Sequence, residues 1–353
     1  MKTTPSMLIL LAAILGFCWG AVQAAPDHQD LPPEARQFDF WLGSWDVNLR
    51  IRQDDGSWKD SIRSRAKIYP VLDGKAVLEL WDAPDIKGFS LRYFDPARKK
   101  WHLWLNWPKA NRSGSSGLDG SFRHGRGEFF STSSRPDGTE VMSRYTFSDI
   151  TATSLRWDDA FSTDGGETWS HNWVMEFTRT GPESPLPEEG GPGHTWHDGS
   201  RCDLEPFRRF EVLAGRRSGT AERRLEDGSW SRQPAQLTGY TILDGCSVLV
   251  RIQFGEEEHA LRQLMLLTWN TYTDLFEASI LDNRPETPLA VFFGSEEGDR
   301  ILLTHKPAAD TNPDRRHLWN LDDEVVRLEI QKTEDQGETW QTVVRAGFEQ
   351  KSD

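Results

Sequence analysis

Two carboxylates of the sequence, Glu79 and Glu176, lie beside tryptophans within short apolar stretches. Burial among apolar side chains raises the pKa of a carboxyl group because it disfavours the charged form, and such a group can act as a general acid. Alternation counted back from Arg179 places Glu176 on the solvent side of its stretch, but it does not decide the face of Glu79. Glu79 is therefore the candidate catalytic residue, for acid chemistry on an apolar substrate.

Aromatic and polar side chains mix in several other stretches, as they do in the linings of ligand pockets. Within 101–107, His102, Trp104 and Asn106 share one face, and the opposite face is wholly apolar. The alternation fits two structures: a pocket lined by the mixed face, or an ordinary core with His102 and Asn106 at the surface. The candidate ligand-binding residues are Trp81, Arg92, His102, Trp104, Arg144, Trp157, His171 and Trp173.

Sequence patterns of other common sites are missing. There is no Gly-x-Ser-x-Gly elbow, no phosphate-binding glycine loop and no His-Glu-x-x-His zinc helix. His194 and His197 lie in a stretch without periodicity, so we expect neither a metal nor a cofactor. Cys202 and Cys246 are the two cysteines beyond the N-terminal segment, and in an oxidising compartment we expect them to form one disulfide rather than two buried thiols.

The chain contains two copies of one unit. Asp-Gly-Ser-Trp occurs at 55–58 and 227–230, Leu-Asp-Gly at 72–74 and 243–245, and Gly-Glu-Thr-Trp at 166–169 and 337–340. Three motifs in one order at offsets of 171 or 172 residues indicate a tandem duplication. We expect the first copy at 37–180 and a diverged second copy at 207–350, joined by a Pro- and Gly-rich linker at 181–206.

Each copy consists of short strand-like stretches separated by Gly, Asp, Asn or Pro at a spacing of roughly ten residues. Only the segment before Gly43 is typical of a short helix. Evenly spaced strands predict a sandwich or a barrel, and closure into a barrel removes exposed sheet edges. The predicted fold is all-β, with two tandem antiparallel up-and-down barrels of about eight to ten strands each.

The pattern Ser-x-Asp-x-Gly-x-Thr-Trp spans 162–169, and a near copy that begins with Thr spans 333–340. In such a box the Asp accepts backbone N–H groups across a turn, the Gly takes a left-handed conformation and the Trp packs over the hairpin. Sialidase-type propellers carry similar boxes, but propeller blades repeat every ~40–50 residues, and these boxes lie 171 residues apart. The residues predicted to be structural here are Asp164, Gly166, Trp169, Asp335, Gly337 and Trp340.

Gly43-x-Trp45 stands at the head of the first strand-like stretch. In this it resembles the lipocalins and their relatives in the calycin superfamily. That resemblance implies an arginine late in the last strand that stacks on the motif tryptophan, and Arg179 occupies that place. The repeat offset maps Trp45 onto Arg217 and Arg179 onto Gln350, so the second copy lacks both members of the pair. We expect Gly43, Trp45 and Arg179 to close one end of the first barrel rather than to contact a ligand.

The first copy is also similar to an uncharacterised family of exported bacterial proteins with a lipocalin-like domain. The similarity rests on the stretches 40–47, 92–101 and 164–169. It implies the fold and little chemistry, because no function is assigned to that family. Nitrobindins, other calycin relatives, hold haem through a histidine; His171 is the inward candidate here, but no motif supports that transfer.

The first 24 residues are typical of a signal peptide, with Lys2, an apolar run at 7–21 and a small-residue cleavage site ending at Ala24. That run is too short and wrongly flanked to span a membrane, and no other run is long enough. We therefore expect a periplasmic or secreted protein without a membrane span. The net charge of −14 argues against nucleic acid and anionic membranes as partners.

Of the 16 tryptophans, ten fall in the first copy and four in the second, so an aromatic pocket is expected in the first barrel. The leading hypothesis is an exported protein that binds a small hydrophobic or aromatic ligand there, by tryptophan stacking and with Arg92, His102 and Arg144 orienting a polar end. The alternative is an enzyme on a double lipocalin-like scaffold, with hydratase- or cyclase-like acid chemistry on an apolar substrate. A third hypothesis is a structural module whose tryptophans are ordinary core.

Overall fold

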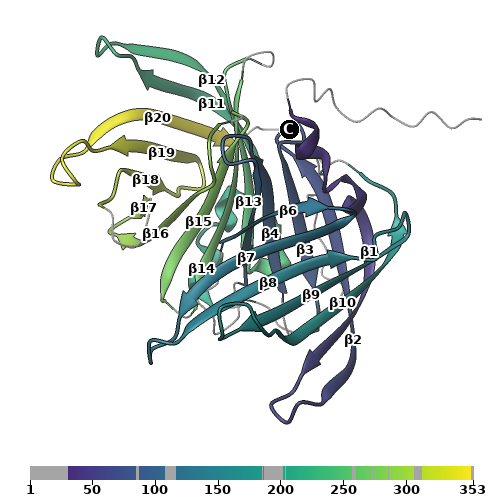
Figure 1. Ribbon diagram of the computed structural model, residues 1–353. Helices are drawn as coiled ribbons and strands as arrows, with labels where there is room; N and C mark the ends of the chain where they lie inside the picture. The colour runs from purple at the N-terminus through teal and green to yellow at the C-terminus, as the bar shows by residue number, and fades with distance from the viewer. Residues whose placement is uncertain are drawn as a thin grey trace, which may run out of the picture.

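The chain folds into two closed antiparallel β-barrels, as the computed structural model shows (Figure 1). Neighbouring strands in the chain are neighbours in each barrel, so the predicted all-β class and up-and-down order are confirmed. The structure describes residues 31–84, 87–107, 117–184, 186, 202, 204–256, 260–271, 273–284, 286–305 and 312–350. The predicted signal peptide and most of the predicted linker lie outside these residues.

The first barrel is closed by the pairing of its first and last strands, in which Trp45 lies opposite Arg179. Its ten strands are β1 (Gly43–Arg52), β2 (Trp58–Val71), β3 (Ala76–Asp82), β4 (Lys87–Asp95), β5 (Lys100–Asn106), β6 (Gly117–Arg123), β7 (Arg126–Ser134), β8 (Glu140–Ser148), β9 (Ser154–Ser162) and β10 (Ser170–Gly181).

The second barrel is closed in the same way, with Arg217 opposite Gln350. Its ten strands are β11 (Gly215–Arg224), β12 (Trp230–Ile242), β13 (Ser247–Phe254), β14 (Leu261–Asn270), β15 (Leu275–Asp282), β16 (Ala290–Glu297), β17 (Arg300–His305), β18 (Arg315–Asn320), β19 (Val325–Lys332) and β20 (Gln341–Gln350). The repeated Leu-Asp-Gly motif forms the turn before β3 and before β13. All three of its residues have positive φ in both copies.

A short helical segment precedes each barrel and covers one of its ends. Before β1 these are η1 (Pro33–Arg36) and η2 (Asp39–Trp41). Before β11 they are α1 (Glu205–Arg208) and η3 (Glu211–Leu213); a further turn, η4 (Leu243–Gly245), precedes β13. Gly43 joins η2 to β1 at a φ of 122°, and a Cβ there would lie 2.6 Å from the Arg179 guanidinium, so glycine is required.

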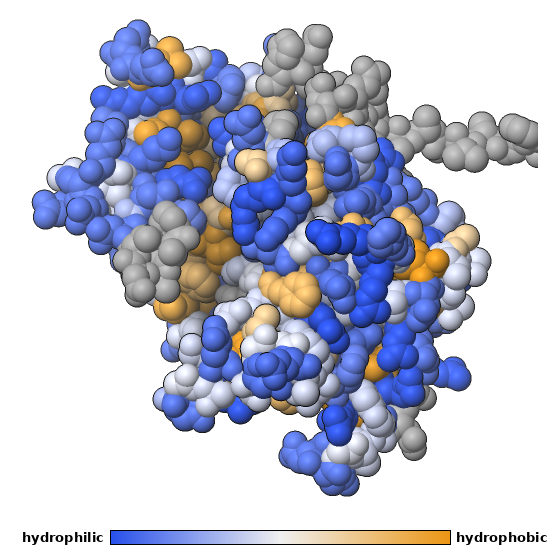
Figure 2. All heavy atoms as spheres, in the orientation of Figure 1, coloured by the Kyte–Doolittle hydropathy of each residue, from blue (hydrophilic) through white to orange (hydrophobic). Residues whose placement is uncertain are grey.

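The two barrels share a third apolar cluster that lies between them. It joins the outer faces of β3 and β4, through residues such as Leu78 and Leu91, to the outer faces of β13 and β14, through residues such as Leu249 and Leu266. Both faces of β3 are therefore buried, one in the barrel and one against the partner barrel, and all seven residues of the strand are buried. In Figure 2 the visible face is largely hydrophilic, with hydrophobic residues mainly in a recess on the side of the second barrel.

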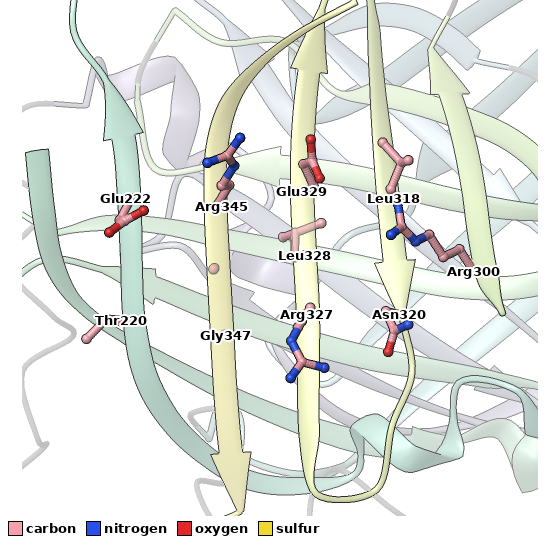
Figure 3. A pocket seen from close by; sticks show the side chains of 11 residues that line it. Thr220, Glu222, Arg300, Leu318, Asn320, Arg327, Leu328, Glu329, Arg345 and Gly347 are labelled. Carbon is pink, nitrogen blue, oxygen red and sulfur yellow. The ribbon is translucent and has the colours of Figure 1, made fainter. Parts of the chain in front are cut away.

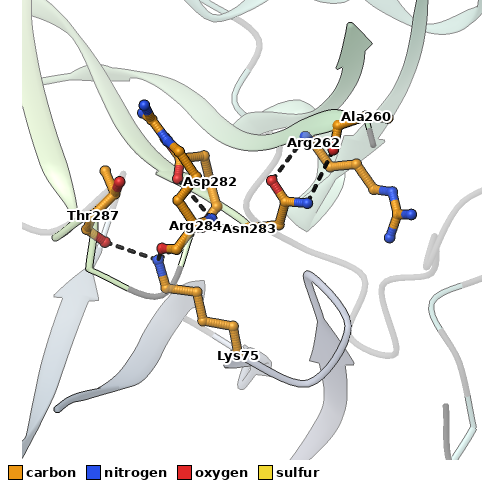
Figure 4. A network of polar contacts seen from close by, with 7 residues as sticks. All are labelled: Lys75, Ala260, Arg262, Asp282, Asn283, Arg284 and Thr287. Atoms are coloured by element: carbon orange, nitrogen blue, oxygen red, sulfur yellow. Dashed lines mark hydrogen bonds and ion pairs between the residues drawn. The ribbon is translucent and has the colours of Figure 1, made fainter. Parts of the chain in front are cut away.

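Polar contacts also join the barrels. The Lys75 ammonium donates to the carbonyl oxygens of Asp282 at 2.9 Å, Thr287 at 2.8 Å and Arg284 (Figure 4). Burial lowers the pKa of Lys75 to about 8, and the nearby Asp282 opposes that effect. Cys202 and Cys246 form a disulfide with a Cα–Cα distance of 4.9 Å, which ties the chain ahead of α1 to the start of β13.

Candidate functional site

A polar group of three side chains lies inside the first barrel on β3 and β4. The Ser90 hydroxyl donates to Glu79 Oε2 at 2.6 Å, and Arg92 Nη2 donates to the same oxygen at 3.2 Å. All three side chains are buried. They project inward because they share their faces with Val77, Trp81 and Phe94, which belong to the barrel core. Glu79, whose face the sequence left open, therefore points inward.

Burial acts on both charges of this group. It raises the pKa of Glu79, and the opposing effects of Arg92 and of the two hydrogen bonds do not cancel that shift. Burial likewise lowers the pKa of Arg92 to about 10, although the Glu79 carboxylate acts in the other direction. The pair is thus an ion pair held in a medium that penalises both charges.

The guanidinium of Arg92 packs against three aromatic rings. Its guanidinium carbon is 3.8 Å from the centre of the Trp41 ring, 5.2 Å from that of Phe147 and 5.3 Å from that of Phe38. Stacking satisfies the face of the guanidinium, but its edge is only partly used, because Arg92 Nε and Nη1 have no hydrogen-bond acceptor. Such unpaired buried donors are rare in proteins and call for an explanation.

A cluster of aromatic rings lies toward the other end of the same barrel. Trp81 contacts Trp107 and Trp173, with ring centres 5.3 and 5.7 Å apart, and Trp157 contacts Trp173 and Tyr145 at 6.3 and 4.9 Å. Trp173 pairs with Ile51, at the end of β1 remote from Trp45. The indole nitrogens of Trp81 and Trp173, like that of Trp41, have no acceptor. The interior is therefore aromatic and rich in unpaired N–H donors.

The second barrel has no counterpart of this polar group. In the first barrel, Glu79 pairs with Ile68 of β2 and with Ser90 of β4. The residue at the same register position of the second barrel is Val250, which pairs with Gly239 of β12 and with Met265 of β14. Leu267 likewise takes the place of Arg92, since it pairs with Val248 as Arg92 pairs with Val77. Val250, Met265 and Leu267 are buried core residues. The fold therefore does not require a buried ion pair at this place, which makes the first barrel's pair a candidate functional feature.

His102 and Trp104 do not line this interior, and the pocket prediction for them is wrong. The apolar face of β5, with Trp101, Leu103 and Leu105, is the one that faces the core. Trp104 Nε1 instead donates to Ser279 Oγ of the second barrel at 2.9 Å, and His102 Nδ1 lies 2.9 Å from Asp119 Oδ1. The mixed face is aromatic because the second barrel covers part of it.

Arg144 and His171 also lie outside the lumen, contrary to their prediction as pocket residues. Arg144 stacks on Trp169, with its guanidinium carbon 4.2 Å from the ring centre, and Arg316 repeats this contact on Trp340 at 4.3 Å. His171 lies opposite Ala160, because a β-bulge between His171 and Trp173 reverses the alternation. Its side chain is 42% exposed and its Nδ1 lies 2.9 Å from Asp158. Of the predicted ligand-binding residues, Trp81, Trp157 and Trp173 form one cluster inside the barrel, and Arg92 lies in the same interior under Trp41.

The structure places Arg179 over Trp45, with 4.1 Å between its guanidinium carbon and the ring centre. Arg179 also donates to the carbonyl oxygens of Leu42, Phe40 and Ala152, which ties the segment before β1 to the end of the barrel.

The second barrel keeps an arginine at this end but takes it from another strand. Arg217, at the position of Trp45, donates to the carbonyl oxygens of Val212 at 2.9 Å and Asp323 at 3.0 Å. These two carbonyls are the counterparts of Phe40 and Ala152 by the repeat offset. Sequence comparison of the copies shows only a missing pair, whereas the structure shows the same bonds made from the first strand.

Both Asp-boxes form hairpin turns of the predicted kind. Asp164 Oδ1 accepts from the backbone N–H of Thr168 at 3.0 Å, and Asp335 Oδ1 accepts from that of Thr339 at 2.8 Å. Gly166 and Gly337 have φ of 93° and 96°. The indoles of Trp169 and Trp340 donate to the carbonyls of these glycines. Hydrogen bonds to Thr339 and Thr333 lower the pKa of Asp335 to about 2.

A hollow of about 340 Å³ lies on the outer wall of the second barrel (Figure 3). It deepens at Gly347 of β20, where a Cβ would meet only Val325, at 4.0 Å. Charges of both signs alternate across it, since Arg345 lies opposite Glu222 on one side and Glu329 on the other. Because these charges compensate one another within the wall, we place the candidate site in the first barrel.

No protein-family model and no curated protein matches this sequence. Among solved structures, an S-type phycobiliprotein lyase CPES from Guillardia theta matches 43% of this chain and all of its own length, at 12% identity and a TM-score of 0.31. A DUF3598-family protein of unknown function from Nostoc punctiforme covers 91% of this chain and all of its own, at 12% identity and a TM-score of 0.26. A transferrin binding protein B double mutant from Haemophilus parasuis covers 88% of this chain and 76% of its own, at 8% identity and a TM-score of 0.19. Likenesses this weak bear on neither a ligand nor an activity.

Proposed function

We propose that this protein binds a small ligand with an aromatic or hydrophobic body inside the first barrel, where Arg92 holds a polar end. The observation that carries the proposal is the buried Glu79–Arg92 pair, which has unpaired N–H groups and no counterpart in the second barrel. We further propose that the chain is exported after cleavage near Ala24 and that its lipocalin-like domains span 37–180 and 207–350. No helix among the described residues is long and apolar enough to cross a membrane.

The donors of the interior indicate what the ligand must offer. Arg92 Nε and Nη1 and the indoles of Trp41, Trp81 and Trp173 all donate and none accepts. Each buried donor left unpaired costs about 1–3 kcal/mol, so a ligand with carboxylate or carbonyl oxygens recovers part of that cost. Its body would pack on the Trp81–Trp173 cluster by ring stacking.

The test is a double substitution that copies the second barrel. Glu79→Val with Arg92→Leu removes both charges together, so no unpaired charge is left buried. We expect the double variant to lose at least about tenfold in affinity for aromatic carboxylate probes that quench tryptophan emission in the parent. Arg144→Leu is the matched control, because Arg144 stacks on Trp169 outside the lumen. Unchanged affinity in the double variant would contradict the proposal. Native mass spectrometry of protein from its own host would identify a co-purified ligand.

One observation favours the second candidate function, acid catalysis. Glu79 is inward and buried, and its raised pKa keeps a larger share of it protonated than in water. An enzyme of this kind would use Glu79 to protonate an apolar substrate in the lumen. Glu79→Gln keeps the shape of the side chain and its hydrogen-bond acceptor but removes the transferable proton. Loss of turnover of the co-purified compound with retained binding would support catalysis, and retained turnover would exclude it.

A further inference from the structure

The second barrel carries a basic cluster of its own, on different strands from the polar group of the first barrel. His305 ends β17 and lies opposite Arg315, the first residue of β18, and His317 follows on the same face of β18. This face points inward, because its other members, Leu303 and Trp319, belong to the core of the second barrel.

The cluster surrounds the Phe292 ring on β16. The ring centres of His317 and His305 lie 4.5 and 5.2 Å from that of Phe292, and the Arg315 guanidinium carbon lies 5.9 Å from it. Arg315 Nη2 is 3.4 Å from His305 Nδ1. Three basic side chains thus converge on one apolar ring.

Asp314 is the acidic member of this group and lies at its rim. Its Oδ1 is 2.6 Å from His305 Nδ1, and its Oδ2 is 3.5 Å from Arg315 Nε. A carboxylate at Nδ1 fixes the proton there and turns Nε2 of the same ring toward other partners. One carboxylate stands against one guanidinium and two imidazoles, so the cluster has more basic groups than acidic ones.

His317 shows that this arrangement is not simply satisfied core. It is only 3% exposed, and its Nδ1 has no hydrogen-bond partner. Burial, followed by the nearby Arg315 and His305, lowers the pKa of His317 to about 3, so the ring is neutral near pH 7. A neutral imidazole has one N–H to donate, and here it lies beside two basic groups.

The fold does not demand the cluster. In the first barrel, the pair Ser131 and Ser143 occupies the positions of His305 and Arg315. The pair Phe129 and Tyr145 occupies the positions of Leu303 and His317. The copy that lacks the Glu79–Arg92 pair therefore has basic residues where the other copy has two serines and a tyrosine. Arg315 also pairs with Lys332, at the end of β19 remote from Val325 and the covered end of the barrel.

We infer that this end of the second barrel binds a small carboxylate, with the Arg315 guanidinium holding the anion, His317 donating to it and Phe292 packing against its carbon skeleton. Guanidinium and imidazole donors around one carboxylate form charge-assisted hydrogen bonds, which are stronger than neutral ones. The site is separate from the lumen of the first barrel, and the inference does not depend on the function proposed for that lumen.

The experiment titrates the full mature chain, carrying Glu79→Val and Arg92→Leu to silence the first barrel, with benzoate followed by histidine NMR resonances. Shifts of His305 and His317 should saturate with benzoate and not with the neutral isostere benzamide. Arg315→Gln should weaken binding about tenfold or more. The matched control is Arg316→Gln, one residue along, which loses contacts on the outer face of the barrel: the stack on Trp340 and the hydrogen bond to Gln331.

Three outcomes would overturn the inference. Equal responses to benzoate and benzamide would show that no anion is recognised. Equal effects of Arg315→Gln and Arg316→Gln would show that the inward arginine takes no part. Saturable binding of Zn²⁺ alone, undiminished by Arg315→Gln and without any benzoate response, would show a metal site instead. Far-UV circular dichroism of each variant checks that the barrels remain folded.

Discussion

The buried pair of Glu79 and Arg92 predicts different stabilities for single and double substitution. Arg92→Leu alone leaves a buried carboxyl group without its cation, and removing one partner of a buried ion pair costs about 3–5 kcal/mol. Glu79→Val alone leaves the guanidinium unpaired, with a similar cost. The double variant has neither charge, and the second barrel has Val250 and Leu267 at these positions as members of its core. We therefore expect a coupling energy of about 2–3 kcal/mol between the two substitutions.

Urea unfolding followed by tryptophan emission and far-UV circular dichroism measures this coupling. The control cycle is Arg50 with Glu176, an exposed pair across β1 and β10 of the same barrel with an N–O distance of 3.1 Å. Exposed pairs couple by about 1 kcal/mol or less. If the losses at Glu79 and Arg92 simply add, the two charges do not depend on each other and the reasoning from the second barrel fails.

The single variant Arg92→Leu also makes a pH prediction. Burial raises the folded-state pKa of Glu79 above its ordinary value of 4.5, and loss of Arg92 removes the main opposing effect. A carboxyl group with a raised folded-state pKa binds more protons folded than unfolded. Its contribution is therefore fully present below pH 4.5 and is lost as the pH rises toward the folded-state pKa. The stability of Arg92→Leu should therefore fall more steeply over that range than that of the double variant, which lacks the Glu79 carboxyl group.

Three further predictions concern contacts that the structure adds to the sequence. Burial raises the pKa of Glu277 to about 7, although hydrogen bonds from Asn270 and Asn106 act in the other direction. The free energy of unfolding in urea should therefore fall as the pH rises from about 4.5 to 7, and Glu277→Gln should reduce this fall. Trp104→Ala should lower the melting temperature, because it removes the hydrogen bond to Ser279 and part of the contact between the barrels. It should leave the affinity of the first barrel for the probe unchanged, and a tenfold loss of that affinity would show that Trp104 does contact the ligand. Arg217→Leu should destabilise the second barrel by about 1–3 kcal/mol, because the carbonyl oxygens of Val212 and Asp323 lose their donor. If the variant unfolds in urea as the parent does, this end of the barrel needs no arginine.

The fold was predictable because it depends on repeated local signals. The turn motifs recur at one offset, and each has the same backbone geometry in both copies: Leu72 and Leu243 have φ of 53° and 52°. The contact of Trp45 with Arg179 followed from their places at the two ends of the repeat. Such features are carried by neighbouring residues, so one sequence contains them.

The facing of the site residues depended on contacts that the sequence does not contain. Both faces of β5 are aromatic, one for the barrel core and one for contact with the second barrel, and alternation alone cannot tell these apart. His171 was placed inward by alternation from Arg179, but one bulge before Trp173 reverses the count. Comparison of the two copies could have found the buried group, because the second copy has the apolar residues Val250 and Leu267 at the positions of Glu79 and Arg92.

The way the barrels meet explains where they differ. Trp104 of β5 and Ser279 of β15 are equivalent positions of the two copies, and they contact each other directly. The outer faces of β3 and β4 pack on those of β13 and β14, so equivalent strands form the contact from both sides. Substitutions on these outer faces disturb both barrels at once, whereas each lumen is independent of the other. Divergence after duplication is therefore least constrained inside the barrels, where one copy has Glu79 and Arg92 and the other has Arg315 and His317. If each lumen binds a ligand of its own, as proposed above, substitutions in one lumen should leave ligand binding in the other unchanged.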